Sequence, residues 1–265
     1  MRLPLYQVDA FASEVFRGNP AAVCPLDAWL PDDTMARIAE ENNLAETAFL
    51  VRTAPARYDL RWFTPTVEMD LCGHATLATA FVLHERLGQG SSPITFDTRS
   101  GPLVVTREDD GYTLDFPARR PTRLAVDPEV TAAIGREPLE LWRARDYLAV
   151  YSTEAEVRAI APDFGRVQAL GAFAVIVTAP ADAALSPGAD FVSRFFAPGA
   201  GVPEDPVTGS AHCTLVPYWA DRLQRATLEA RQVSRRGGAL RCVLDGDRVR
   251  MTGTAVCYLE GTISI

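Results

Sequence analysis

RWFTPTVEMDLCGHATLATAFVLHERLG (61–88) and RFFAPGAGVPEDPVTGSAHCTLVPYWADRL (194–223) have the same layout. In each stretch, a short strand pattern and a proline precede a glycine that opens a long apolar helix pattern. A hairpin pattern follows each helix. From Gly73 to Gly111 is 38 positions, and from Gly209 to Gly246 is 37. The chain therefore contains an internal repeat, which is the first feature to use in assigning a fold.

The repeat predicts an α+β protein of two similar halves, residues 1–117 and 118–265. Each half would be a curved, mostly antiparallel sheet around one apolar helix, and a pseudo-twofold axis would relate the two. The linker is expected in PARRPTRLAVDP (117–128), which is rich in Pro and Arg. If the halves face each other, both helix N-termini would open into one cleft.

Further elements are expected in the first half. DDTMARIAEENNL (32–44) predicts a helix that an Asp caps and an Asn pair ends. The central helix is expected to close at Gly88, and a hairpin to turn on Asp110-Gly111.

Composition excludes several classes of protein. The chain has 265 residues, 48% of them hydrophobic, which is enough to build a full core, and a net charge of -8, which argues against nucleic-acid binding. It contains no lysine, so Schiff-base, pyridoxal-phosphate and Walker-A chemistry are excluded. The five cysteines form no CxxC pair, and no apolar run could span a bilayer. These observations predict a cytoplasmic protein with free thiols that acts on a small molecule.

The glycine of the first copy lies between Cys72 and His74. A helix N-terminus presents unpaired N–H groups and partial positive charge, so Gly73 would let a carboxylate approach closely. Glu46 follows the expected end of a helix and leads into an apolar strand, so its carboxylate could lie at the edge of a cleft. From this chain alone, a solvated loop acid is the commoner situation for such a Glu, and a capping role the commoner one for such a His.

The second copy places polar side chains around Gly209, namely Glu204, Asp205, Thr208, Ser210 and His212. Proton transfer at carbon needs one group that removes a proton and one that returns it, and acids beside an anion site can do both. A metal site is not expected, because His74, His84 and His212 have no paired ligand spacing. His84, deep in its helix, is expected to be structural.

Five ordered blocks, FRGNPAAV, NNLAETAFL, DLCGHATLATAF, SGPLVV and FFAPGAGVPEDPVTGSAH, resemble the PhzF-type isomerases of phenazine biosynthesis over nearly the whole chain. The resemblance implies a fold like that of diaminopimelate epimerase, no cofactor, a homodimer and a small carboxylate substrate similar to dihydro-hydroxyanthranilate. It also implies that a glutamate moves a proton between ring carbons. The implied catalytic residues are Glu46, His74 and Asp205, and the implied substrate-binding residues are Asn19, Gly73, Thr208, Gly209 and Ser210.

Two other functions stay open. CGHAT also resembles the first half-site of proline racemases and diaminopimelate epimerases, in which that Cys is one of two catalytic thiols. Thr208 occupies the place of the second thiol, so paired-thiol racemisation is not expected, but an epimerase or dehydratase that uses Cys72 alone is an alternative. A non-catalytic protein that binds a small acid is the other alternative.

Overall fold

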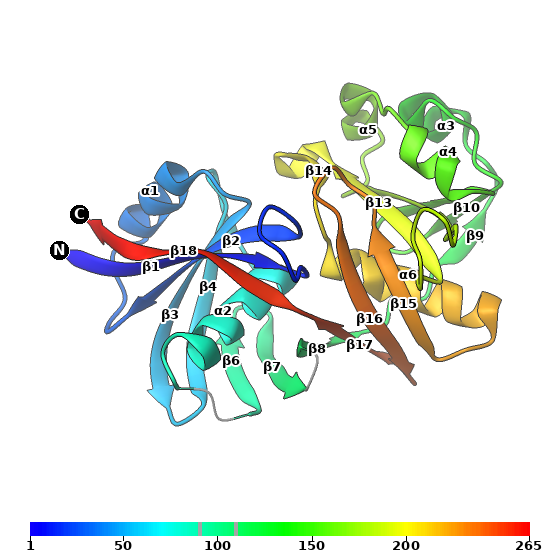
Figure 1. Cartoon of the computed structure of the whole chain (residues 1–265). Coiled ribbons are helices and arrows are strands. Elements are labelled where there is room, and N and C mark those ends of the chain that lie inside the picture. The colour runs from blue at the N-terminus through cyan, green and yellow to red at the C-terminus, as the bar shows by residue number, and fades with distance from the viewer. Residues whose placement is uncertain (90–91, 109–110) are drawn as a thin grey trace. The chain divides into compact units, whose positions relative to one another are not determined.

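A computed structural model describes residues 1–89, 92–108 and 111–265 and divides the chain into two compact units (Figure 1). The first unit comprises Met1–Asp115 and Met251–Ile265, and the second comprises Phe116–Arg250. The sequence places the C-terminal segment in the second half, whereas the structure groups it with the first. The physical reason is that β18 (Ala255–Ser264) pairs antiparallel with β1 (Arg2–Ala10) along its whole length.

The first unit is a sheet around one central helix. Besides β1 and β18, its elements are β2 (Asn19–Leu26), α1 (Asp32–Asn42), β3 (Glu46–Ala54), β4 (Arg57–Phe63), β5 (Glu68–Met69), α2 (Gly73–Glu85), β6 (Ile94–Thr98) and β7 (Gly101–Glu108). Strands β8 (Gly111–Pro117) and β17 (Arg248–Gly253) carry the chain between the units.

The second unit has the same plan with more helices. Its elements are β9 (Thr122–Leu124), α3 (Pro128–Ile134), β10 (Glu140–Arg143), β11 (Tyr147–Val150), α4 (Glu154–Ala159), α5 (Phe164–Ala169), β12 (Val175–Pro180), β13 (Phe191–Ala197), the 3₁₀ turn Pro198–Ala200, β14 (Val202–Asp205), α6 (Gly209–Leu223), β15 (Thr227–Gln232) and β16 (Gly238–Asp245).

Strand pairing confirms the internal repeat. In the first unit the pairs β1–β2, β2–β3, β3–β4, β4–β6 and β6–β7 alternate between antiparallel and parallel, beginning and ending antiparallel. The second unit has the same alternation in β10–β11, β11–β12, β12–β13, β13–β15 and β15–β16. The predicted α+β class with two similar halves is therefore confirmed.

Each central helix is buried on nearly all sides, as its sequence predicts. Every residue from His74 to Leu83 in α2 is buried, because this helix is apolar around its whole circumference. Helix α6 contains Pro217, which cannot donate to the carbonyl of Cys213. That carbonyl instead accepts a 2.7 Å hydrogen bond from the backbone N–H of Arg119. The proline is thus accommodated without an orphaned acceptor.

Helix α1 packs on the other side of the first sheet, through Met35, Ile38 and Ala39. It ends where the Asn pair predicts, at Asn43, whose φ of 47° is left-handed. The expected Asp cap is wrong, because Asp32 is the first helical residue and no side chain caps the helix. Of the expected hairpin turn, Asp110 lies outside the described residues. None of the described helices is both long and apolar enough to cross a membrane.

Candidate active site

Helix α2 begins without a side-chain cap. Cys72 precedes it in extended conformation (φ −143°, ψ 108°), and Gly73 is its first residue. The Cys72 carbonyl accepts a 2.6 Å hydrogen bond from the Thr76 hydroxyl. The N-terminal amides consequently remain the electropositive end of a 13-residue buried helix.

The side chains of Glu46 and His74 meet beside this N-terminus. Glu46 is the first residue of β3, directly after the loop that follows α1, and its exposed fraction is only 9%. Its Oε2 lies 3.0 Å from Nε2 of His74, which is 5% exposed. The two atoms are buried and are not aligned as a hydrogen bond, so both can interact with a third group. Glu46 is therefore no solvated loop acid.

Asn19 holds the opposite side of the imidazole. Its amide nitrogen lies 3.2 Å from Nδ1 of His74 and donates to it when the imidazole is neutral, which leaves Nε2 as the protonated nitrogen facing Glu46. Asn19 is fully buried. The preceding Gly18 has a φ of +64°, and a Cβ there would lie 2.2 Å from the Ala10 carbonyl oxygen, so the turn requires glycine. The FRGNP block thus orients the ring of His74.

Cys72 contacts the same ring, with Sγ 3.5 Å from Nδ1 of His74. Burial, followed by the nearby charge of Glu46, raises the pKa of the Cys72 thiol. For His74, burial by itself would lower the pKa, but Cys72 and Glu46 outweigh it and raise the pKa well above its usual value. The same cluster therefore raises the pKa of both the thiol and the imidazole.

At the N-terminus of α6, a polar network holds Thr208. The Thr208 hydroxyl donates to the Asp205 carboxylate, and its backbone N–H donates to Oε1 of Gln232 over 2.9 Å. The Gln232 amide nitrogen donates in turn to the Asp205 carbonyl and the Thr208 hydroxyl. Asp205 and Thr208 are consequently fixed in orientation ahead of Gly209.

A cation lies beside Ser210, the second residue of α6. Arg145 donates from Nη2 to the Ser210 hydroxyl over 3.2 Å and forms two bonds to the carboxylate of fully buried Asp146. Its guanidinium also stacks 4.2 Å from the Phe173 ring centroid. Sequence reasoning missed Arg145 and Gln232, because each lies far along the chain from the α6 motif and neither belongs to a recognisable pattern.

Other candidates have structural roles. Glu204 forms a two-bond pair with Arg194, just as Glu68 does with Arg61 in the first unit. His212 is fully buried, its Nδ1 donates to the Thr208 carbonyl over 2.8 Å, and burial lowers its pKa to about 4. Glu204 therefore stabilises the repeat, and His212 holds the backbone of Thr208 in place.

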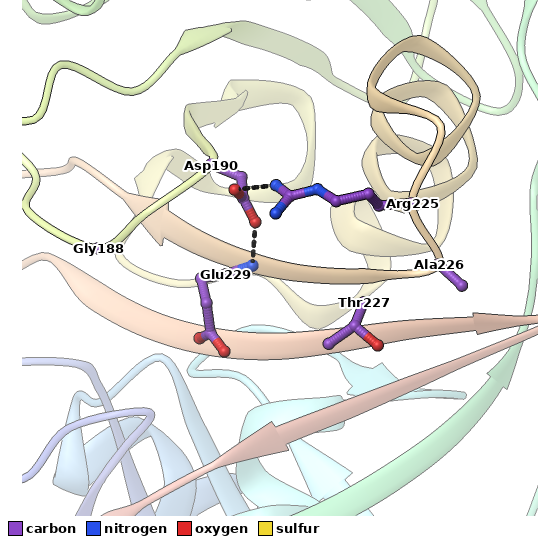
Figure 2. Close-up of a pocket in the computed structure, with 6 residues that line it drawn as sticks. All are labelled: Gly188, Asp190, Arg225, Ala226, Thr227 and Glu229. Atoms are coloured by element: carbon purple, nitrogen blue, oxygen red, sulfur yellow. Dashed lines mark hydrogen bonds and ion pairs between the residues drawn. The ribbon is translucent and has the colours of Figure 1, made fainter.

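A pocket on the second unit is separate from these residues (Figure 2). It is lined by Gly188, Asp190, Arg225, Ala226, Thr227 and Glu229. Figure 2 shows Asp190 engaged by the Arg225 guanidinium and by the Glu229 backbone N–H. The Asp190 carboxylate is therefore paired with Arg225, and none of the predicted site residues lines the pocket.

The structure brings together two groups of predicted residues. The first unit gathers Asn19, Glu46, Cys72, Gly73 and His74. The second unit gathers Asp205, Thr208, Gly209 and Ser210. Their roles in binding and catalysis remain predictions.

Comparison with known proteins assigns the family. The family model described as Phenazine biosynthesis-like protein (PhzC-PhzF) matches residues 8–261. The chain belongs to this family. It is 51% identical to an uncharacterized isomerase of Pseudomonas aeruginosa over 100% of both chains, and 44% identical to one of Halalkalibacterium halodurans over 99% of both. The structure of a PhzF-family protein from Enterococcus faecalis matches with a TM-score of 0.95 and 49% identity, over 100% of both chains.

A more distant likeness bears on the fold alone. A predicted epimerase of Pseudomonas aeruginosa matches with a TM-score of 0.72 at 20% identity, over 98% of this chain and 99% of that one. The expected epimerase-like fold of this PhzF-family protein is confirmed. The expectation of an enzyme of the isomerase class is also confirmed at the level of the family, whose relatives are named isomerases.

Proposed function

We propose that this PhzF-family protein is a cofactor-independent isomerase that moves a proton within a small carboxylate substrate resembling trans-2,3-dihydro-3-hydroxyanthranilate. The observation that carries the proposal is the buried Glu46–His74 pair, with 3.0 Å between Oε2 and Nε2. A carboxylate near an imidazole and largely shielded from water can take a proton from carbon and return it.

Glu46 is the proton carrier in this mechanism. Its carboxylate removes a proton from a C–H acidified by the substrate's unsaturated system, and the carboxylic acid so formed returns that proton to another carbon. No atom is gained or lost, so the product is an isomer. His74 donates from Nε2 to the group on which negative charge develops, and Asn19 keeps the ring oriented for this.

Substrate binding is proposed for the helix N-termini. Gly73 at the start of α2 offers amides in the positive end of the helix dipole. In the second unit the proposed contacts are Asp205, Thr208, Gly209 and Ser210. Arg145, which donates to the Ser210 hydroxyl, adds a cation suited to a carboxylate.

One observation favours the alternative in which Cys72 acts as a base, namely its 3.5 Å contact with Nδ1 of His74. The raised pKa of the buried thiol opposes it, since the thiolate is the reactive form. Thr208, moreover, takes the place of a second thiol, and its hydroxyl is already bonded to Asp205. Glu46 is thus the stronger candidate base.

The test is proton NMR in D₂O with dihydro-hydroxyanthranilate and a panel of amino and imino acids, using wild type, Glu46→Gln and Cys72→Ala. Loss of a general acid–base should slow ring-proton exchange on the order of a hundred- to ten-thousandfold in Glu46→Gln. Circular dichroism checks that each variant is folded. Full turnover in Glu46→Gln would refute the role of Glu46, and Cα exchange that requires Cys72 would favour the epimerase alternative.

Assembly and location form part of the same proposal. The family resemblance implies a homodimer, and the sequence composition predicts a cytoplasmic location. Sedimentation equilibrium of the purified chain should give twice its mass of 28.8 kDa, and a monomer at micromolar concentration would contradict the dimer.

A further inference from the structure

The cluster of Glu46, Cys72 and His74 contains more than proton transfer requires. The proposed mechanism uses the Glu46 carboxylate and the His74 imidazole, and it gives the Cys72 thiol no role. All three residues are buried, with exposed fractions of 9% for Glu46, 6% for Cys72 and 5% for His74. One carboxylate oxygen, one ring nitrogen and the sulfur all lie within 4.8 Å of one another.

Two of the three ligand atoms also lack a completed hydrogen bond. Glu46 Oε2 and His74 Nε2 are buried without such a bond among the described residues, although only 3.0 Å separates them. Buried polar atoms are normally satisfied, so this pair points to a third group between them. Metal ligands about 2.0–2.3 Å from a zinc ion lie roughly 3–4 Å from one another. The three ligand atoms of the cluster, all within 4.8 Å of one another, are close to that spacing.

We propose that Glu46, Cys72 and His74 form a binding site for a thiophilic divalent cation, Zn²⁺ in the first instance. The ligand set decides the class of metal. A sulfur and an imidazole nitrogen favour Zn²⁺ over Mg²⁺ and Ca²⁺, which take oxygen ligands. Three protein ligands leave a fourth position of a tetrahedral ion open to water or substrate. On binding, the Sγ–H bond of Cys72 and the Nε2–H bond of His74 break and Zn–S and Zn–N bonds form; the thiol proton passes to solvent and the imidazole proton moves to Nδ1.

The consequence for activity rests on the proposed function. A metal ion bound here occupies Oε2 of Glu46 and a nitrogen of His74, the groups that would handle the proton. Zn²⁺ is therefore an inhibitor of the isomerase. Cys72 is the residue that makes the proton-transfer pair sensitive to this ion.

Isothermal titration calorimetry with ZnCl₂ on the full chain tests the site without substrate. All proteins carry Cys257→Ser, because Cys257 is a partly exposed thiol elsewhere in the chain. This background should bind one equivalent of Zn²⁺. Loss of an outer-shell partner already costs 10- to 100-fold in metal affinity, so removal of a ligand in Cys72→Ala should weaken binding at least about a hundredfold. The control Cys24→Ala, which removes another buried thiol of the same unit, should bind as the background does.

A second measurement does not depend on the folding of the Cys72→Ala variant. Co²⁺ bound to the Cys257→Ser protein should show a thiolate-to-cobalt charge-transfer band and the intense visible bands of four-coordination. Absence of the thiolate band, or equal Zn²⁺ affinity in Cys72→Ala, would overturn the site.

Activity measurements test the proposed inhibition by Zn²⁺ separately from Zn²⁺ binding. Zn²⁺ should abolish turnover over the concentration range in which it binds. Saturating Zn²⁺ that leaves turnover intact would show that the ion does not occupy the Glu46–His74 pair, and would overturn the proposal. An active Glu46→Gln protein would refute the proposed function, whereas the calorimetric result would still decide the metal site.

Discussion

The N-termini of α2 and α6 have similar backbone conformations, but the pKa values of their histidines shift in opposite directions. Both helices begin at a glycine after an extended residue that makes no side-chain cap. His74 is the second residue of α2, beside Glu46, and its pKa is raised. His212 is the fourth residue of α6, bonded to a backbone carbonyl, and its pKa is lowered to about 4. The partners of each histidine therefore decide the direction in which its pKa shifts.

Strand register identifies the residue of the second unit that takes the place of Glu46. Phe63 pairs with Thr47, and its repeat counterpart Phe196 pairs with Val175. The residue before each partner is Glu46 in the first unit and Ala174 in the second. The two units therefore share a scaffold, whereas proton-transfer groups of this kind are found in the first.

Exchange of counterpart residues between the two units should have the largest effect on activity. Ser210 is the counterpart of His74, so His74→Ser copies the second unit into the first. Turnover should fall by about a hundredfold or more, since the group that stabilises developing charge is lost. His212→Thr, which introduces the counterpart Thr76, should keep turnover within several-fold. Steady-state kinetics on both proteins decides; equal losses would contradict a special role for His74.

The pH dependence of unfolding should distinguish His212 from His74. The folded pKa of His212 lies below the unfolded value of 6.5, so the unfolded chain binds more protons between pH 6.5 and about 4. Stability should therefore be lost as pH falls through this window, by on the order of 3 kcal/mol for this group. Urea unfolding at several pH values should show a shallower slope in His212→Thr.

The raised pKa of His74 gives the opposite sign. Its contribution to stability is present in full below pH 6.5 and is lost as pH rises through the folded pKa. A pH slope in His212→Thr identical to that of wild type would show that His212 does not stay neutral on folding.

The two arginine–glutamate pairs should differ in their effect on stability. Arg194 binds Glu204 and also donates to the carbonyls of Val157 and Ile160, which attaches the α4 segment to β13. Arg61 binds Glu68 and the exposed Asp32. Arg194→Met should lower the free energy of unfolding by roughly 1–3 kcal/mol, between the values for surface and buried pairs. Arg61→Met should cost less in the same urea titration, and the reverse order would contradict this account.

Asn19 should have the smallest effect, because it acts through His74. Asn19→Ala removes the amide contact with Nδ1 of His74 and should lower kcat about tenfold, the factor typical of an outer-shell partner. Asn19→Asp places a carboxylate at Nδ1, which favours the imidazolium, so the pH profile of kcat/KM should move upward.

Asn42→Ala serves as the control, since Asn42 donates to the Thr47 hydroxyl and not to the imidazole. A pH profile in Asn19→Asp identical to that of wild type would mean that the asparagine is merely structural.

The sequence by itself determined the secondary-structure pattern and the internal repeat of this protein, through local chemistry and hydrophobic periodicity. The repeat, the apolar central helices and the end of α1 at Asn43 follow from short-range patterns of glycine, asparagine and hydrophobic residues. The motif resemblance also named Glu46, Cys72 and His74. These features depend on residues close together in the chain, and so they could be predicted from it.

Only the tertiary structure showed the contacts between residues that are far apart in the chain. The pairing of β18 with β1 moved the C-terminal segment into the first unit. Asn19 turned out to support His74, and Arg145 and Gln232 joined the α6 N-terminus from remote strands and loops. The pKa of each histidine was likewise set by burial and by partners that no spacing reveals, because electrostatic interactions act through space and not along the chain.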